Sequence, residues 1–226
     1  MMELRAEKIS RDFLRYSAKD GYFTAVAETD FTLAAGTLTA VTGRSGSGKS
    51  TLLHILGGLM KPVTGRVLLD ETDIYALSEA ERDALRRRHI GIAPQRLMSL
   101  AALTVRENIL LPALLTGQEG AAAVRADVLM ERLGIRKLAS VAPSELSGGE
   151  LRRVTIARAL VMQPDILLAD EPTGDLDEEN TRSVLRLLRE TADAGTAVLL
   201  VTHEREAAAY ADAAYTMTAG KLDKIA

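Results

Sequence analysis

Residues 43–51 read GRSGSGKST, and this stretch decides the fold. It matches the pattern G-x-x-x-x-G-K-[ST] of a phosphate-binding loop (P-loop). An apolar run at residues 38–41 leads into it and helically spaced apolar residues 51–56 leave it, so the context predicts a strand, a tight loop and a helix. Glycines let the backbone bend around a phosphate, while the loop N–H groups and the helix N-terminus would point at the anion.

Two side chains of this loop have the chemistry of a nucleotide site. Lys49 can reach the β- and γ-phosphates, and the Ser50 hydroxyl can ligate Mg²⁺. The residues expected to bind nucleotide here are Gly43, Arg44, Ser45, Gly46, Ser47, Gly48, Lys49, Ser50 and Thr51.

Composition narrows the class of protein. The chain has 226 residues, of which 47% are hydrophobic, enough to fill a sizeable core. Its net charge of -3 gives no basic field for nucleic acid, and the absence of cysteine excludes disulfides and thiolate metal sites. No apolar signal core opens the chain, and no apolar stretch approaches the roughly 20 residues that span a bilayer. We therefore expect any membrane role to come through a separate partner.

The remaining pattern predicts an α/β fold. Residues 3–9 and 22–33 alternate as antiparallel strands around a polar turn, and residues 66–70 read as a further strand. Capping boxes at Ser78 and Thr104 open helices, and residues 96–163 are dominated by apolar helical segments. Apolar runs at 90–94, 165–170 and 197–201 predict buried strands, with an amphipathic helix that stops at Gly195 between the last two.

Two carboxylates lie at the predicted end of a buried strand. Asp170 and Glu171 fall where ligands bind in open α/β sheets. A P-loop protein needs a carboxylate there to hold Mg²⁺, which suits Asp170, and the adjacent Glu171 can act as general base toward the attacking water.

The segment at residues 146–150, LSGGE, opens a helix and has two interpretations. Ser147 and Glu150 form a capping box, which needs no glycine. Gly148 and Gly149 each cost about 0.8–1.0 kcal/mol relative to alanine inside a helix, whereas close approach of a phosphate to a bare helix N-terminus would require them.

Taken together these motifs resemble those of the nucleotide-binding subunit of an ABC transporter. The matching pieces are the P-loop, Gln95, the signature motif at 146–150, the strand at 166–171, the DLD at 175–177 and His203, in the family order over nearly the whole chain. The stretches STLLHILGGL, ELSGGE and LADEPTGDLD are similar to the lipoprotein-release and macrolide-export type of ATPase.

The resemblance implies a single ABC ATPase domain over residues 1–226. It implies a P-loop NTPase (RecA-like) core at 1–95 and 164–226 with an N-terminal antiparallel β subdomain. The α-helical insert subdomain at 96–163 would carry the signature motif.

The resemblance also implies roles for single residues. Gln95 would contact Mg²⁺ and the attacking water, and His203 would hold the γ-phosphate. Asp175 and Asp177 would lie at a dimer seam, although Asp177 also suits an N-cap. The signature residues expected to bind the ATP of the opposite copy are Ser147, Gly148, Gly149 and Glu150.

Some positions depart from the family pattern. Glu150 stands where Gln is common, although Glu occurs in the lipoprotein-release type. Pro94 and Glu204 stand where an aromatic residue and aspartate are common. The aromatic that stacks on adenine, most often a tyrosine, is expected to be Phe13, with Tyr16 as the alternative.

The function implied by the resemblance is ATP hydrolysis in a head-to-tail dimer that sandwiches ATP and Mg²⁺. A permease related to the lipoprotein-release, macrolide-export or cell-division type would be the membrane partner, at the cytoplasmic face of the plasma membrane. The alternative is a regulatory or mechanotransmission module that moves no cargo. Four apolar side chains in the loop after Gln95 can face this partner or be buried in the helical insert: Leu97, Met98, Leu100 and Leu103.

Overall fold

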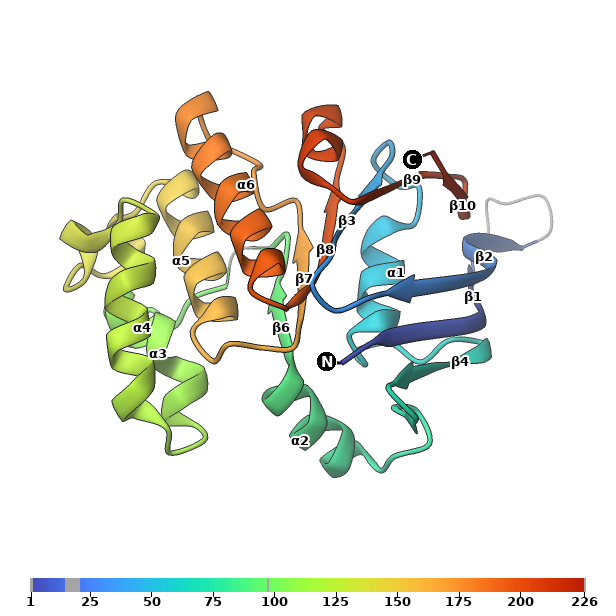
Figure 1. Ribbon diagram of the computed structural model, residues 1–226, viewed down its shortest axis with the longest axis horizontal. Coiled ribbons are helices and arrows are strands. Elements are labelled where there is room, and N and C mark those ends of the chain that lie inside the picture. The colour runs from blue at the N-terminus through green and yellow to red at the C-terminus, as the bar shows by residue number, and fades with distance from the viewer. Residues whose placement is uncertain (1, 15–20, 97, 226) are drawn as a thin grey trace.

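A six-stranded sheet forms the centre of the molecule, in the order β10–β9–β3–β8–β7–β6 (Figure 1). The computed structural model describes residues 2–14, 21–96 and 98–225. The strands are β3 (Leu38–Thr42), β6 (Ile90–Ala93), β7 (Ile166–Asp170), β8 (Ala197–Thr202), β9 (Ala213–Thr218) and β10 (Lys221–Lys224). β10 runs antiparallel to β9, and the other neighbouring pairs are parallel. β7 and β8 are buried along their whole length, which explains their continuous apolar sequences.

A second sheet, in the order β2–β1–β4–β5, is antiparallel. Its strands are β1 (Leu4–Leu14), β2 (Tyr22–Leu33), β4 (Thr64–Leu69) and β5 (Thr72–Asp73). The predicted bounds were too short: β1 runs five residues past residue 9, and β4 begins two residues before residue 66. Pairing explains both differences, because Leu14 lies opposite Tyr22 and Ser10 lies opposite Thr64.

The helices are α1 (Lys49–Leu56), α2 (Glu79–His89), α3 (Val105–Leu114), α4 (Glu119–Arg132), α5 (Gly148–Leu160) and α6 (Glu178–Asp193). Short 3₁₀ helices cover Arg136–Leu138, Pro143–Glu145 and Arg205–Tyr210. The capping boxes at Ser78, Thr104 and Ser147 are confirmed, each closed by a glutamate three residues later. Helix α6 buries the apolar face predicted from its sequence.

The central sheet has an apolar core on each face. Side chains of β7 alternate between them: Leu168 packs with α1 and the antiparallel sheet, while Leu167 packs with α5 and α6. Figure 1 shows α1 on one side of the sheet and α3, α4, α5 and α6 on the other. Ile109 of α3 and Met130 of α4 belong to the same cluster as Leu167. Because residues 96–163 share this core with the sheet, the division of the chain at 95/96 and 163/164 stays a prediction.

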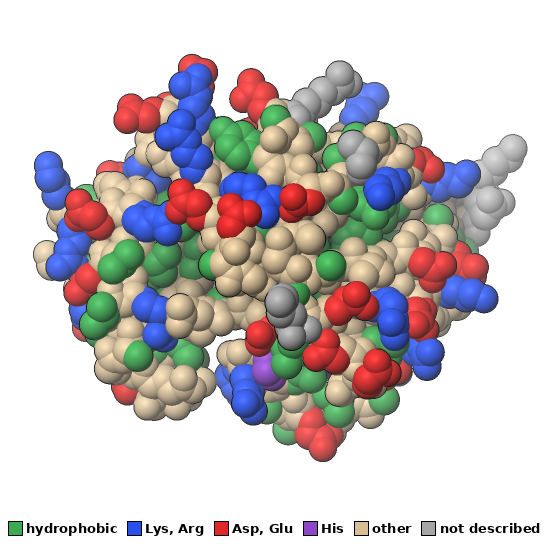
Figure 2. All heavy atoms as spheres, viewed as in Figure 1, with side chains coloured by type: hydrophobic (Ala, Val, Ile, Leu, Met, Phe, Trp, Pro, Cys, Tyr) green, Lys and Arg blue, Asp and Glu red, His purple; other side chains and the backbone are tan. Residues whose placement is uncertain are grey.

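The surface is mixed in charge. Figure 2 shows acidic and basic side chains interspersed over the face it presents. Across the described ranges, we find no helix with both the length and the apolar composition needed to cross a bilayer.

Candidate active site

The P-loop ends at a helix terminus with no side-chain cap. Helix α1 starts at Lys49. No side chain caps its first N–H groups, because the N-cap residue is Gly48, and its first turn holds no acidic residue. Gly48 has φ 111°, and a Cβ there would meet the Ala25 carbonyl oxygen at 1.8 Å, so only glycine fits. The first N–H groups and the positive end of the helix dipole therefore remain for an anion.

A cavity of about 630 Å³ opens at this helix end. Its lining brings together residues from five separate parts of the sequence: Phe23, Arg44, Ser45, Gly46, Gly48, Lys49, Ser50, Thr51, Gln95, Glu171 and His203. Every predicted catalytic residue is among them. Gly43 and Ser47 lie in the same loop outside this lining, and the buried Ser47 hydroxyl has no hydrogen-bond partner in the described part of the chain.

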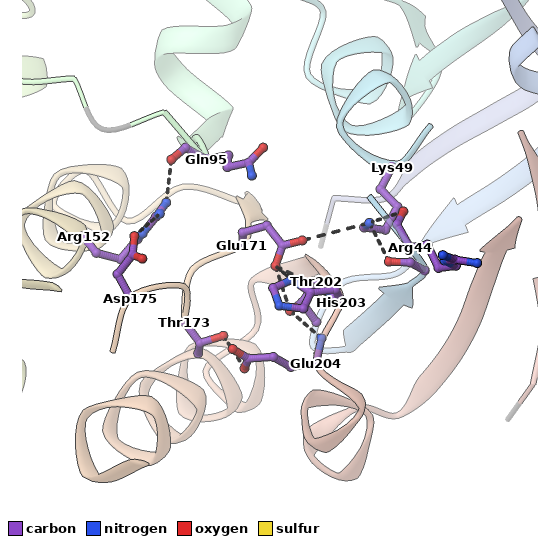
Figure 3. A network of polar contacts seen from close by, with 11 residues as sticks. Arg44, Lys49, Gln95, Arg152, Glu171, Thr173, Asp175, Thr202, His203 and Glu204 are labelled. Atoms are coloured by element: carbon purple, nitrogen blue, oxygen red, sulfur yellow. Dashed lines mark hydrogen bonds and ion pairs between the residues drawn. The ribbon is translucent and has the colours of Figure 1, made fainter. Parts of the chain in front are cut away.

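Lys49 is held at the mouth of its own loop. Its ammonium donates hydrogen bonds to the carbonyl oxygens of Gly43 at 2.8 Å and Arg44 at 3.2 Å, and lies 4.0 Å from Glu171 Oε1 (Figure 3). The lysine side chain is 7% exposed. A phosphate entering the cavity would therefore meet a positive charge that is already positioned and largely desolvated.

Glu171 is fixed by the end of the neighbouring strand. Its Oε2 accepts hydrogen bonds from the Thr202 hydroxyl at 3.1 Å and the His203 backbone N–H at 3.3 Å, and lies 2.9 Å from His203 Nδ1. Glu171 also has φ 49°, in the left-handed region that costs an L residue about 1–2 kcal/mol. Figure 3 shows the carboxylate directed toward Lys49 of the P-loop.

Asp170, at the end of β7, is 3% exposed. Burial raises the pKa of its carboxyl group, the nearby Glu171 charge adds to this, and the Ser50 hydroxyl opposes it. Among the described residues, its Oδ1 has no hydrogen-bond partner. A buried carboxylate oxygen without a partner is costly unless a cation or water meets it.

The departure at Glu204 has a structural consequence. Its Oε2 accepts a hydrogen bond at 2.7 Å from the hydroxyl of the buried Thr173 (Figure 3). The loops that follow β7 and β8 are thereby tied together beside Glu171 and His203.

The aromatic residue at the cavity differs from the expected one. Phe13 is not among the lining residues, and the Arg11 guanidinium lies 4.9 Å from its ring centroid. Its partner across the β1–β2 ladder, Phe23, lines the cavity instead. Tyr16, the predicted alternative, lies outside the described residues. Phe23 was missed because the sequence does not show that it lies directly opposite Phe13, nor which of the two rings lines the cavity.

The signature helix α5 starts away from this cavity. Ser147 and Gly148 are exposed, and neither they nor Gly149 and Glu150 line it. Glu150 Oε2 accepts hydrogen bonds from the N–H and hydroxyl of Ser147, and these bonds lower the pKa of Glu150. A Cβ at Gly149 would lie 3.1 Å from the Asp175 carbonyl oxygen, so packing within the chain also explains this glycine. For Gly148 the position of a Cβ is more open, with Asp175 Cβ at 3.9 Å.

Asp175 and Asp177 follow Glu171 in an exposed turn. Asp177 is the N-cap of α6 and accepts from the Asn180 N–H at 2.8 Å, which confirms the capping interpretation. Asp175 lies 3.7 Å from Arg152, a residue that sequence reasoning missed. The assignment of both aspartates to a dimer seam remains a prediction.

Comparisons with known proteins agree with this geometry. Residues 26–174 match the ABC transporter family. The chain is 41% identical over 227 residues to the lipoprotein-releasing system ATP-binding protein LolD of Shewanella sp. (strain MR-7), covering 99% of this chain and 96% of the relative. It is also 41% identical to the probable syringafactin export ATP-binding/permease protein SyfD of Pseudomonas syringae pv. syringae, covering 92% of this chain and 32% of that protein.

Solved structures of ABC cassettes also resemble this chain. A dimeric ATP-binding cassette in a post-hydrolysis state with ADP and phosphate superposes with a TM-score of 0.88 and 29% identity, over 99% of each chain. A dimeric bacterial ABC transporter cassette gives a TM-score of 0.88 at 28% identity. With its P-loop, Gln95, Glu171 and His203 gathered in one cavity, this chain is an ATP-hydrolysing member of the ABC transporter family.

Proposed function

We propose that this chain powers a lipoprotein-releasing or related export system by hydrolysing ATP between two copies of itself. One observation carries the mechanism: the P-loop, Gln95, Glu171 and His203 share a cavity, while the signature helix of the same chain starts outside it. A second copy would supply the missing side of the site. Identity across 99% of the chain with a lipoprotein-releasing system protein supports the choice of system.

The phosphates would be held by the N-terminus of α1 and by Lys49. Mg²⁺ fits the same place, because the buried Asp170 Oδ1 has no partner in the described chain and the Ser50 hydroxyl is nearby. We find no cluster of three or more His, Cys, Asp or Glu side chains among the described residues. Mg²⁺ needs none, since it commonly binds through one or two carboxylates together with substrate phosphates. With Ser50, Asp170 and Gln95 around it, the ion would neutralise charge on the β- and γ-phosphates.

Glu171 would accept the proton of the attacking water as general base. Its bonds to Thr202 and His203 leave Oε1 directed to the P-loop side, toward Lys49. His203, 63% exposed at its side chain, would use its second ring nitrogen to contact the γ-phosphate. The signature residues of the other copy would bind that phosphate from the opposite side, so ATP favours closure of the dimer and hydrolysis releases it.

The permease would dock in an apolar groove of about 330 Å³ between α2, β6, α3 and α5. Leu111, Pro112 and Leu115 line it, and Leu115 is 72% exposed. Its basic residues include Arg87 and Arg158, for which we find no ion pair within the described residues. Figure 2 shows the surface hollowed between α2 and the lower ends of α3 and α4, with basic side chains beside the hollow. A permease segment that fits is an amphipathic helix with leucine-like residues on one face and acidic residues beside them.

The loop after Gln95 offers further apolar surface to such a partner. Met98 is 63% and Leu100 50% exposed, which favours a partner-facing interpretation over burial for these two. Leu103 is half-buried, and Leu97 lies outside the described residues. The chain would thus sit peripherally at the cytoplasmic face of the plasma membrane through its permease.

Reconstitution tests this function. The chain would be purified from detergent-solubilised membranes, and the membrane protein that accompanies it would be identified and incorporated with it into liposomes carrying a lipoprotein. We expect ATP to drive release of the lipoprotein and Glu171→Gln to stop it. ATP hydrolysis without release of any lipoprotein would overturn the proposed cargo class, and would favour the regulatory alternative if the permease moved no other cargo.

A further inference from the structure

We infer that Arg152 is a positioning residue that connects the ATP pocket of its own chain to the signature motif, which would contact the ATP bound by the second copy. The inference rests on the proposed function, because it assumes the two-copy site. Arg152 lies one helical turn into α5, five residues after Ser147. At 1.5 Å per residue, its backbone is about 6 Å along the axis from Gly148, the first residue of the helix.

The guanidinium reaches across to the Gln95 loop. Its Nη1 donates a hydrogen bond of 2.7 Å to the Gln95 carbonyl oxygen and a longer one of 3.5 Å to that of Pro94. Figure 3 shows this carbonyl facing Arg152 while the Gln95 side chain extends to the other side, toward Glu171. A shift of Arg152 would therefore move the backbone that carries the Gln95 side chain.

The same guanidinium faces the Asp175 turn. Nη2 lies 3.7 Å from Asp175 Oδ2, although this carboxylate is 74% exposed and the pair is long, so we expect little net attraction from it. The start of α5 also lies close to this turn, because a Cβ added at Gly149 would be 3.1 Å from the Asp175 carbonyl oxygen. A shift at the start of α5 would therefore be felt by the Asp175 turn.

Because the Arg152 side chain is buried, its hydrogen bond to the Gln95 carbonyl is important for this charged group. The Arg152 side chain is 6% exposed, and its Nε is buried without a hydrogen-bond partner in the described part of the chain. A desolvated cation depends on the few acceptors it has. The short bond to Gln95 is charge-assisted and thus the strongest contact this group makes. When a phosphate of the second copy's ATP binds at the start of α5 and displaces it, this bond would pass the displacement to Gln95, which lies in the other ATP pocket.

The chain contains a matched control. Arg125 on α4 also donates a hydrogen bond of 2.7 Å to a backbone carbonyl, that of Val161 just beyond α5. It ties α4 to the opposite end of the same helix and touches neither Gln95 nor Asp175. Losing it should affect folding stability as an arginine–carbonyl bond does, without affecting the ATP pocket.

The test compares Arg152→Gln, Arg152→Lys and Arg125→Gln with wild type. We would measure Tm, the Kd for a fluorescent ATP analogue, kcat, and the Hill coefficient for ATP. For Arg152→Gln we expect Kd within about twofold, kcat lower by about tenfold, and a Hill coefficient closer to one. Lysine keeps one charged donor, so Arg152→Lys should recover most of kcat, and Arg125→Gln should keep wild-type kcat.

A double mutant separates this role from a merely structural one. Gln95→Ala keeps the carbonyl that Arg152 contacts but removes the side chain through which it would act. Adding Arg152→Gln to Gln95→Ala should then lower kcat no further. Additive losses, or an Arg152→Gln kcat equal to wild type, would overturn the inference. If Arg152→Gln does not fold, Arg152→Met, which keeps a long side chain but no donor, takes its place in both comparisons. A kcat that falls only in step with Tm would also overturn the inference. Failure of the wild type to hydrolyse ATP would instead count against the proposed function.

Discussion

The carboxylate of Glu171 lies 2.9 Å from Nδ1 of His203 and 4.0 Å from Nζ of Lys49. It is thus placed between the residue expected to orient the γ-phosphate and the one expected to bind it. Its side chain is 11% exposed, so as the proposed base it would act where water is scarce.

Glu171→Gln should abolish turnover without abolishing ATP binding. The amide keeps the size of the side chain but cannot take a proton, so we expect kcat to fall by about 10²–10⁴. A coupled assay of phosphate release measures this. Glu178→Gln, an exposed glutamate in the first turn of α6, is the control and should match wild type. Equal turnover by Glu171→Gln and wild type would rule out this base.

Phe23→Ala should weaken ATP binding more than Phe13→Ala does. Phe23 lines the cavity and Phe13 does not, and an aromatic stacking contact contributes about 0.5–1.5 kcal/mol. The expected rise in Kd is about 2- to 12-fold for Phe23→Ala, measured with labelled ATP and with labelled inorganic triphosphate as the control ligand, which has no base to stack. A larger rise in Kd for Phe13→Ala than for Phe23→Ala would show that adenine stacks on Phe13, the residue predicted from the sequence.

Asp170→Asn should stabilise the protein in the absence of Mg²⁺ and nucleotide. The pKa of Asp170 is raised above its ordinary value of 3.8, chiefly by burial, so the folded state holds this proton more tightly than the unfolded chain. The free energy of unfolding then falls as pH rises through the folded pKa, and stays lower at neutral pH. Asparagine carries no such penalty.

We expect Asp170→Asn to have a higher Tm than wild type at pH 7. This difference should vanish as the pH drops below 3.8, the ordinary pKa of an aspartate. Thermal unfolding across this range measures it, with Asp223→Asn, an exposed carboxylate on β10, as a control that should not change Tm. A lower Tm at pH 7 for Asp170→Asn would contradict the assigned cause of the pKa shift.

Arg87→Glu should weaken assembly with the permease and leave the ATPase activity of the isolated subunit unchanged. Arg87 is exposed at the rim of the apolar groove, so reversing its charge would repel an acidic docking helix. We expect about 5- to 10-fold less permease captured per subunit, less so at high salt. The control is Lys221→Glu on β10. Equal capture by the two variants would place the docking surface elsewhere.

Local sequence signals predicted much of this structure. The P-loop, the capping boxes and the buried strand before Asp170 each follow from a few adjacent residues whose chemistry permits few alternatives. The central sheet follows as well, because β7 and β8 read as continuous apolar runs.

What the sequence did not reveal depends on how distant segments meet. Phe23, which pairs with Phe13 across one hairpin, lines the cavity in its place, and this pairing is not visible in the sequence. The role proposed for Arg152 depends on its hydrogen bond to the Gln95 carbonyl, 57 positions away. The sequence does not reveal this bond, because arginine in a helix is ordinarily a surface residue. Gly149, attributed to phosphate approach alone, is also favoured by packing, because a Cβ there would lie only 3.1 Å from the Asp175 carbonyl oxygen.

The central claim is that ATP is held between two copies, and sedimentation of Glu171→Gln tests it most directly. With Mg-ATP this variant should sediment as a dimer, and adding Gly148→Asp, which places a carboxylate at the start of the signature helix, should return it to a monomer that still binds ATP. A Glu171→Gln protein that is saturated with ATP yet monomeric at every concentration, or a Gly148→Asp variant that dimerises unchanged, would contradict the account.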